Sequence, residues 1–136
     1  MESAEVRRRF GEARVAHLAT VASDGNPHIV PCVFALAEVA VFTPVDDKPK
    51  RSRDLKRLAN IRAHPRVSVI AGDYDEDWSK LWWVRADGDA TIHEAGPAAD
   101  EGIALLRAKY PQYARRPDPG PIIVVEVQRW SAWTGS

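Results

Sequence analysis

The chain has 136 residues, and its 19 lysines and arginines are balanced by 19 aspartates and glutamates, so the formal net charge is zero at pH 7. A protein that mainly coats nucleic acid normally has a basic excess, which this chain lacks. We therefore expect no nucleic-acid partner, and the length favours a single domain over residues 1–136. Cys32 is the one cysteine, and no stretch reaches the roughly 18 apolar residues of a membrane span. These features predict a cytoplasmic protein without a disulfide or a membrane segment.

A helix followed by strands is predicted in the first part of the chain. Val6 and Phe10 recur at helical spacing between residues 3 and 13, and Ser3 is a suitable N-cap. Three runs of β-forming residues follow, the first two joined by the turn sequence SDGNP: 15–21, 28–36 and 39–43. This order predicts antiparallel pairing.

The next segment, KPKRSRDLKRL at residues 48–58, holds six cationic side chains and one acid. Apolar residues at helical spacing follow, and the sequence HP at residues 64–65 predicts the end of a helix. Lys48, Lys50 and Arg51 are expected to precede this helix, whose first turn offers free N–H groups to an anion. We therefore expect a compact anion such as a phosphate to bind here.

Strands and one more helix are predicted in the remainder of the chain. The expected strands are 67–72, 81–86, 89–93 and 122–130, with a hairpin at the sequence ADGD and a helix at 96–110. The predicted fold is therefore mainly β (α+β), with six or seven antiparallel strands and two or three flanking helices. Closure into a small barrel is expected, because open antiparallel sheets leave exposed edges.

The residues bear on three kinds of chemistry: metal binding, nucleophilic catalysis and contact with a planar ligand. The four histidines have no paired spacing, so no metal site is predicted. Cys32 lies within VPCVF, which is more typical of a buried small side chain than of a nucleophile. Trp82 and Trp83 must face opposite sides of a strand, so one can enter the core and the other can meet either a planar ligand or a second subunit.

Several stretches in order resemble the split β-barrel family of flavin and deazaflavin oxidoreductases, often described as pyridoxamine 5'-phosphate oxidase-like. The matching stretches are LATVASDGNPHIVPCVFAL (18–36), VFT (41–43), the lysine- and arginine-rich loop, LANIRAHPRVSVI (58–70) and RADGDATI (85–92). The segment KPKR together with DYDEDWSKLWWVRADG looks like the branch that uses the deazaflavin coenzyme F420.

The resemblance implies a homodimer with two cofactor sites at the subunit interface. It implies that the cofactor phosphate is held by Thr43 and by cations of the next loop, for which the candidates are Lys48, Lys50, Arg51 and, further along, Arg57. It also implies that Pro31, Cys32 and Val33 lie along the cofactor ring. Three residues are expected to come from the partner subunit or to form the interface beside the pocket: Trp78, Trp82 and Arg85.

The function implied is hydride transfer between reduced F420 and a small conjugated or heterocyclic substrate. A flavin mononucleotide (FMN) enzyme on the same scaffold is the alternative, as is a non-catalytic flavin- or haem-binding protein, for which His28 is the candidate ligand. The cofactor carries the hydride chemistry itself, so no catalytic residue is assigned. His28 and Tyr74 are the side chains to test for proton delivery.

Overall fold

The structure is a computed structural model that describes residues 1–45, 51–115 and 120–136, with the backbone alone described for residues 51–55. Within these residues the helices are α1 (Ser3–Glu12), α2 (Arg51–Ala63), α3 (Pro97–Lys109), α4 (Pro111–Arg115) and the 3-10 helix η1 (Trp78–Lys80). The strands are β1 (Ala16–Val21), β2 (Pro27–Cys32), β3 (Ala35–Ala37), β4 (Ala40–Pro44), β5 (Arg66–Asp73), β6 (Trp82–His93) and β7 (Ile122–Thr134).

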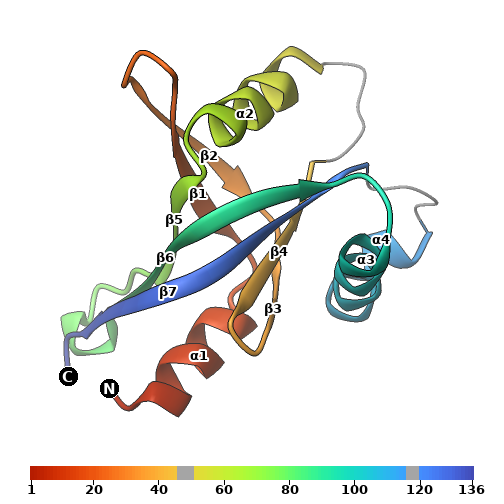
Figure 1. Ribbon diagram of the computed structural model, residues 1–136. Coiled ribbons are helices and arrows are strands. Elements are labelled where there is room, and N and C mark those ends of the chain that lie inside the picture. The colour runs from red at the N-terminus through yellow and green to blue at the C-terminus, as the bar shows by residue number, and fades with distance from the viewer. Residues whose placement is uncertain (46–50, 116–119) are drawn as a thin grey trace.

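The seven strands form one antiparallel sheet in the order β2-β1-β5-β6-β7-β4-β3. Its two edge strands, β2 and β3, are separated in sequence only by Val33 and Phe34. The sheet therefore has to curl until its edges approach each other, and β6 and β7 form the long pair at its centre (Figure 1). This curled half-barrel confirms the predicted mainly β fold.

Helices close the barrel and cover part of its outside. The main core lies inside the curl, where α1 contributes Phe10 and α2 contributes Leu58 and Ile61. A second apolar cluster joins α3 and α4 to the outer side of β3, β4 and β7, with Phe42 and Leu106 among its buried members. Figure 1 places α2 and α1 at opposite ends of the barrel, and α3 with α4 beside β3 and β4.

The predicted hairpin at ADGD is wrong, because residues 82–93 form the single strand β6. The sequence marks a β-bulge between Asp87 and Gly88: Asp87 pairs with Arg129, but Gly88 pairs with Val127, so Gln128 is the additional residue on β7. A Cβ atom at position 88 would clash with the backbone carbonyl of Glu126. Gly88 is thus required by the close approach of β7 and not by a turn.

Smaller differences concern element ends. The predicted run 28–36 divides into β2 and β3, and Pro111–Arg115 forms α4 between the predicted helix 96–110 and the predicted strand 122–130. Ser3 lies within α1, which has Glu2 as its N-cap, and Arg51 is the first residue of α2 instead of preceding it. No helix among the described residues is long and apolar enough to span a membrane.

Candidate functional site

The structure brings four of the predicted cofactor residues together near α2 and the end of β4. Thr43 is fully buried, and its Oγ1 donates a hydrogen bond to the carbonyl of Val33 at 2.8 Å. Arg57 of α2 is only 7% exposed, and its Nη2 lies 3.4 Å from the carbonyl oxygen of Val45. A guanidinium binds oxyanions through charge-assisted hydrogen bonds, so this cation beside Val45 is an anion-binding candidate among the described residues.

Cys32 lies close to both Thr43 and Arg57, which influence its pKa. Burial raises the pKa of the Cys32 thiol, while a hydrogen bond with Thr43 and the positive charges of Arg57 and Lys109 act in the opposite direction. The net effect is a raised pKa, so the thiol is protonated at neutral pH. This agrees with a small buried side chain in the wall of the site and not with an activated nucleophile.

A lysine that the sequence did not single out also lies near Cys32. Lys109, the last residue of α3, donates from Nζ to the carbonyl of Phe34 at 2.9 Å, and its Nζ lies 3.8 Å from the centre of the Phe34 ring. Burial, aided by the charge of Arg14, lowers the pKa of Lys109 to about 8. The neighbouring Tyr110 accepts a hydrogen bond from the Phe34 N–H, so the segment that links β2 to β3 is anchored to α3.

Replacement of this lysine should change how stability depends on pH. Between pH 8 and 10.5 the unfolded chain keeps the Lys109 proton while the folded chain has lost it, so the free energy of unfolding contributed by this group rises with pH. We expect the unfolding free energy of wild type, minus that of Lys109→Met, to increase from about pH 8 to pH 10.5. Urea titrations at several pH values measure it, and a difference that stays constant would contradict the assigned environment.

His28 lies at the same end of the barrel, on β2. It pairs with Thr20 of β1, whose Oγ1 accepts a hydrogen bond from Asn60 Nδ2 of α2 at 3.0 Å. The Nδ1 atom of His28 is buried, and it has no hydrogen-bond partner among the described residues. A buried ring nitrogen without a partner is uncommon in folded proteins.

Three of the predicted phosphate-binding cations cannot be placed as side chains. Lys48 and Lys50 lie outside the described residues, and for Arg51 the structure gives the backbone position at the start of α2. Their role stays a prediction. Pro31, the remaining residue of the predicted ring-binding segment, is exposed on the edge strand β2.

The aromatic part of the predicted site lies elsewhere in the protomer. Trp82 begins β6 and packs against the core beside α1, with the guanidinium carbon of Arg9 5.8 Å from its ring centre. Thr43 pairs with Ile123, which pairs with Ile92 near the other end of β6. Ten residues of strand separate Trp82 from Ile92, or about 30 Å, so Trp82 and Thr43 do not meet within one protomer.

The two other residues expected beside Trp82 lie on η1 and on the outer face of β6. Trp78, in η1, is 67% exposed, and its Nε1 lies 3.4 Å from the hydroxyl of Tyr74. Arg85 lies on the outer face of β6, where its Nε donates to Asp87. Trp83 also faces outward and pairs with Trp133 of β7, so the prediction that Trp82 and Trp83 face opposite sides is confirmed.

No group of three or more histidine, cysteine, aspartate or glutamate side chains is arranged to hold a metal ion within residues 1–45, 51–115 and 120–136. The buried polar groups near α2 are instead a guanidinium, two hydroxyls and an amide: Arg57, Thr20, Thr43 and Asn60. Such groups suit an organic ligand with an anionic part.

A curled antiparallel sheet whose edge strands meet, with helices at both ends, defines the split β-barrel class of proteins. The chain belongs to the pyridoxamine 5'-phosphate oxidase family, whose model matches residues 3–134. No protein with a curated function matches the sequence.

Solved structures from several bacteria share the fold. The conserved hypothetical protein Rv2991 from Mycobacterium tuberculosis has a TM-score of 0.81 and 22% identity, covering 99% of this chain and 86% of that protein. A FAD-binding protein from Mesorhizobium loti has a TM-score of 0.65 and 20% identity, covering 97% and 94%. The haem storage protein HutZ from Vibrio cholerae has a TM-score of 0.72 and 15% identity, covering 97% and 93%. At these identities the likeness establishes the fold.

Proposed function

We propose that this protein is a cytoplasmic F420-dependent oxidoreductase that transfers a hydride between the reduced deazaflavin and a small conjugated or heterocyclic substrate. The observation that carries the proposal is the meeting of Arg57, Thr43 and Cys32 where the chain passes from β4 to α2. A buried guanidinium beside a hydroxyl fits a phosphate group. The sequence resemblance to the F420 branch supports the choice of deazaflavin over flavin.

The protein's part in the reaction is binding and orientation. Arg57, with the cations of residues 48–51, would hold the phosphate, and Pro31 to Val33 would border the ring. When bound, the deazaflavin supplies the hydride chemistry. The barrel wall near Cys32 keeps its thiol protonated and therefore offers no competing nucleophile to the ring.

Binding titrations test this proposal. The purified protein is mixed separately with F420, FMN and haem, and binding is followed by fluorescence quenching or absorbance. We expect F420 to bind most tightly, at micromolar concentration or below. Binding of FMN alone would overturn the deazaflavin assignment while leaving the family assignment in place.

A homodimer is part of the proposal. Helices α3 and α4 cover the outer side of β3 and β4, whereas the outer faces of β2, β1 and β5 carry exposed apolar side chains. Ile29 of β2 is 64% exposed and Ile70 of β5 is 38% exposed. A second copy that covers this face would exclude both from water, and it could bring its own Trp78 and Trp82 towards Thr43, from which they are distant within one protomer.

The double variant Ile29→Asp/Ile70→Asp should be monomeric, because two buried carboxylates without partners are unfavourable in an apolar interface. Analytical ultracentrifugation gives the mass of wild type and variant. The matched control is Val39→Asp, because Val39 is 49% exposed in the turn between β3 and β4. A wild-type monomer, or a variant that stays dimeric, would contradict the proposed interface.

Haem binding is the second candidate, and the free Nδ1 of His28 is the observation that favours it. An imidazole nitrogen is a common axial ligand of haem iron. If haem binds and His28→Ala abolishes the change in its absorption spectrum, the protein is a haem-binding member of this fold. An unchanged haem spectrum in that variant would remove this candidate.

A further inference from the structure

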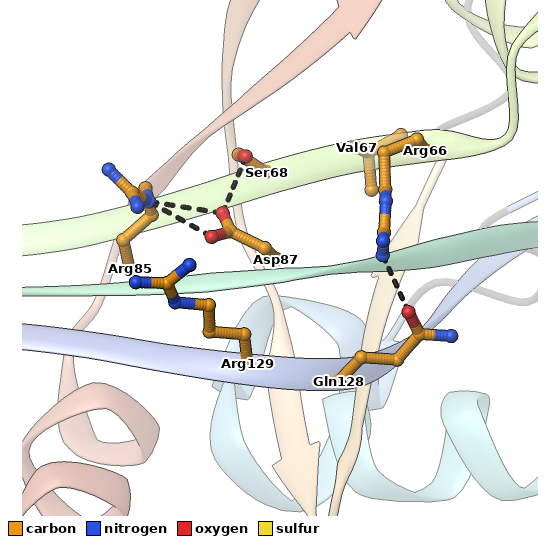
Figure 2. A pocket seen from close by; sticks show the side chains of 7 residues that line it. All are labelled: Arg66, Val67, Ser68, Arg85, Asp87, Gln128 and Arg129. Atoms are coloured by element: carbon orange, nitrogen blue, oxygen red, sulfur yellow. Dashed lines mark hydrogen bonds and ion pairs between the residues drawn. The ribbon is translucent and has the colours of Figure 1, made fainter.

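A charged depression on the outer face of the sheet is separate from the residues near α2. It has a volume of about 510 Å³ and lies over β5, β6 and β7 (Figure 2). Its lining side chains are mainly polar, with three arginines and a single carboxylate: Arg66, Val67, Ser68, Arg85, Asp87, Gln128 and Arg129. The lining therefore has two more positive than negative charges, and the excess is one when Asp89, 3.8 Å from Arg66 at the rim, is included.

The β-bulge on β7 builds this depression. In a regular strand Gln128 and Arg129 would point to opposite faces of the sheet. Because Gln128 is the additional residue of the bulge, both side chains reach the outer surface, and both line the depression. Bulges often redirect side chains at binding sites. Here the bulge places Gln128 as well as Arg129 on the outer face, beside Arg85 and Asp87 of β6.

The single carboxylate of the lining already has partners. Asp87 accepts a hydrogen bond from Ser68 Oγ at 2.6 Å, and Arg85 Nε donates to its two oxygens at 3.0 and 3.3 Å. Asp87 therefore holds the Arg85 side chain in place and is compensated by it. Its negative charge is not available to neutralise the other two arginines.

The other two guanidiniums differ in how they are held. Arg66 Nη1 donates to Gln128 Oε1 at 2.6 Å and lies 3.8 Å from Asp89 at the rim. Gln128 is fixed in turn because its Nε2 donates to Asp89 at 2.8 Å. Arg129 makes no hydrogen bond or ion pair with any residue that the structure describes. Figure 2 shows the Arg85 and Arg129 side chains at one side of the depression and Arg66 at the other.

We propose that this depression is a binding site for a small molecule with at least two oxyanion groups, carboxylate or phosphate. Arg129 and Arg85 receive one anionic group, and Arg66, positioned by Gln128, receives the other. Arg66 pairs with Asp89, four residues along β6 from Arg85, so the two ends are about 13 Å apart at the backbone. Guanidinium groups bind such oxyanions with paired, charge-assisted hydrogen bonds.

Because Arg85 is also expected beside the cofactor pocket, the depression is tested with simple probes on protein free of cofactor. Citrate, pyrophosphate and acetate are added to ¹⁵N-labelled protein at equal ionic strength, and the arginine Nε and backbone signals are followed by NMR. We expect saturable shifts at Arg66, Arg85 and Arg129, with citrate or pyrophosphate binding at least about tenfold more tightly than acetate. The stronger of the two probes identifies the class of ligand.

The variant Arg129→Gln should weaken binding of that probe at least about tenfold, because it removes one guanidinium that contacts the ligand. The Arg85 and Arg66 contacts stay intact, so some binding remains. The affinity of Arg129→Lys for the probe should lie between those of wild type and Arg129→Gln, since lysine keeps the charge without the planar group. Arg62→Gln, on the exposed side of α2, is the matched control and should bind as wild type does.

Two outcomes would overturn the proposal. In the first, the shifts are confined to residues 48–58 or are the same in Arg129→Gln and wild type. In the second, neither probe binds and Arg129→Gln changes the mass of the assembly, which would mean that a second copy occupies the depression.

Discussion

Gly88→Ala should destabilise the protein by about 3 kcal/mol, the upper part of the range for an added methyl group that cannot be accommodated. The new Cβ would meet the carbonyl oxygen of Glu126 closer than any contact allows, and it would lie 2.8 Å from the carbonyl carbon. Both atoms belong to the backbone of β7, so no side-chain rotation can relieve the clash. For a chain of this length the melting temperature should fall by roughly 10 °C.

Gly11→Ala is the matched control for the same chemical change. Its Cβ would meet Leu36 at 3.6 Å, an ordinary contact, and position 11 lies within α1, where alanine is preferred over glycine. We expect this variant to be as stable as wild type or more stable, by up to about 1 kcal/mol. Calorimetry of both variants decides the matter, and equal melting temperatures would contradict the described bulge.

Arg57→Gln should weaken F420 binding by about 10- to 150-fold. A charge-assisted hydrogen bond to a phosphate contributes about 1.5 to 3 kcal/mol, and tenfold in affinity corresponds to about 1.4 kcal/mol. Arg57 is 7% exposed, so water cannot substitute well for the lost guanidinium. Fluorescence titration of F420 into wild type and variant gives the two dissociation constants.

Arg57→Lys and Arg62→Gln separate the roles of charge, geometry and helix. The lysine variant keeps the charge and should bind more tightly than Arg57→Gln but less tightly than wild type. Arg62 is exposed on the same helix, so its replacement should leave affinity within a factor of two. Equal affinity of Arg57→Gln and wild type, with both folded by circular dichroism, would place the phosphate elsewhere.

The fold could be predicted where local patterns decide it. The helical spacing of Val6 and Phe10 is realised in α1, and the turn sequence SDGNP does join β1 to β2. The break after β2 was not predictable from residues 28–36, because it depends on distant packing. Phe34 is fully buried, and its ring centre lies 4.8 Å from that of Phe10.

The ADGD segment shows why the local sequence was insufficient to predict a β-bulge instead of a hairpin turn. The same residues suit a tight turn and a β-bulge, and the choice is made by the approach of Glu126 in β7, which is distant in the sequence. The charged depression escaped prediction for the same reason. Arg66, Arg85 and Arg129 lie on three different strands, and they become neighbours only when the sheet register is known.

For the candidate site, the resemblance predicted residues that local patterns would not have selected. Cys32, Thr43 and Arg57 have no common motif, yet they interact in the structure. Lys109 was missed because it looks like an ordinary basic residue at the end of α3, and its burial against Phe34 depends on how the sheet edges meet.

Native mass spectrometry with competing cofactors measures the proposed dimer and its proposed cofactor together. The protein is incubated with equal concentrations of F420, FMN and haem and transferred from a volatile buffer, so that subunit number and bound mass are read together. We expect a dimer that carries two F420 molecules. A monomer, or a dimer that carries only FMN or haem, would contradict it.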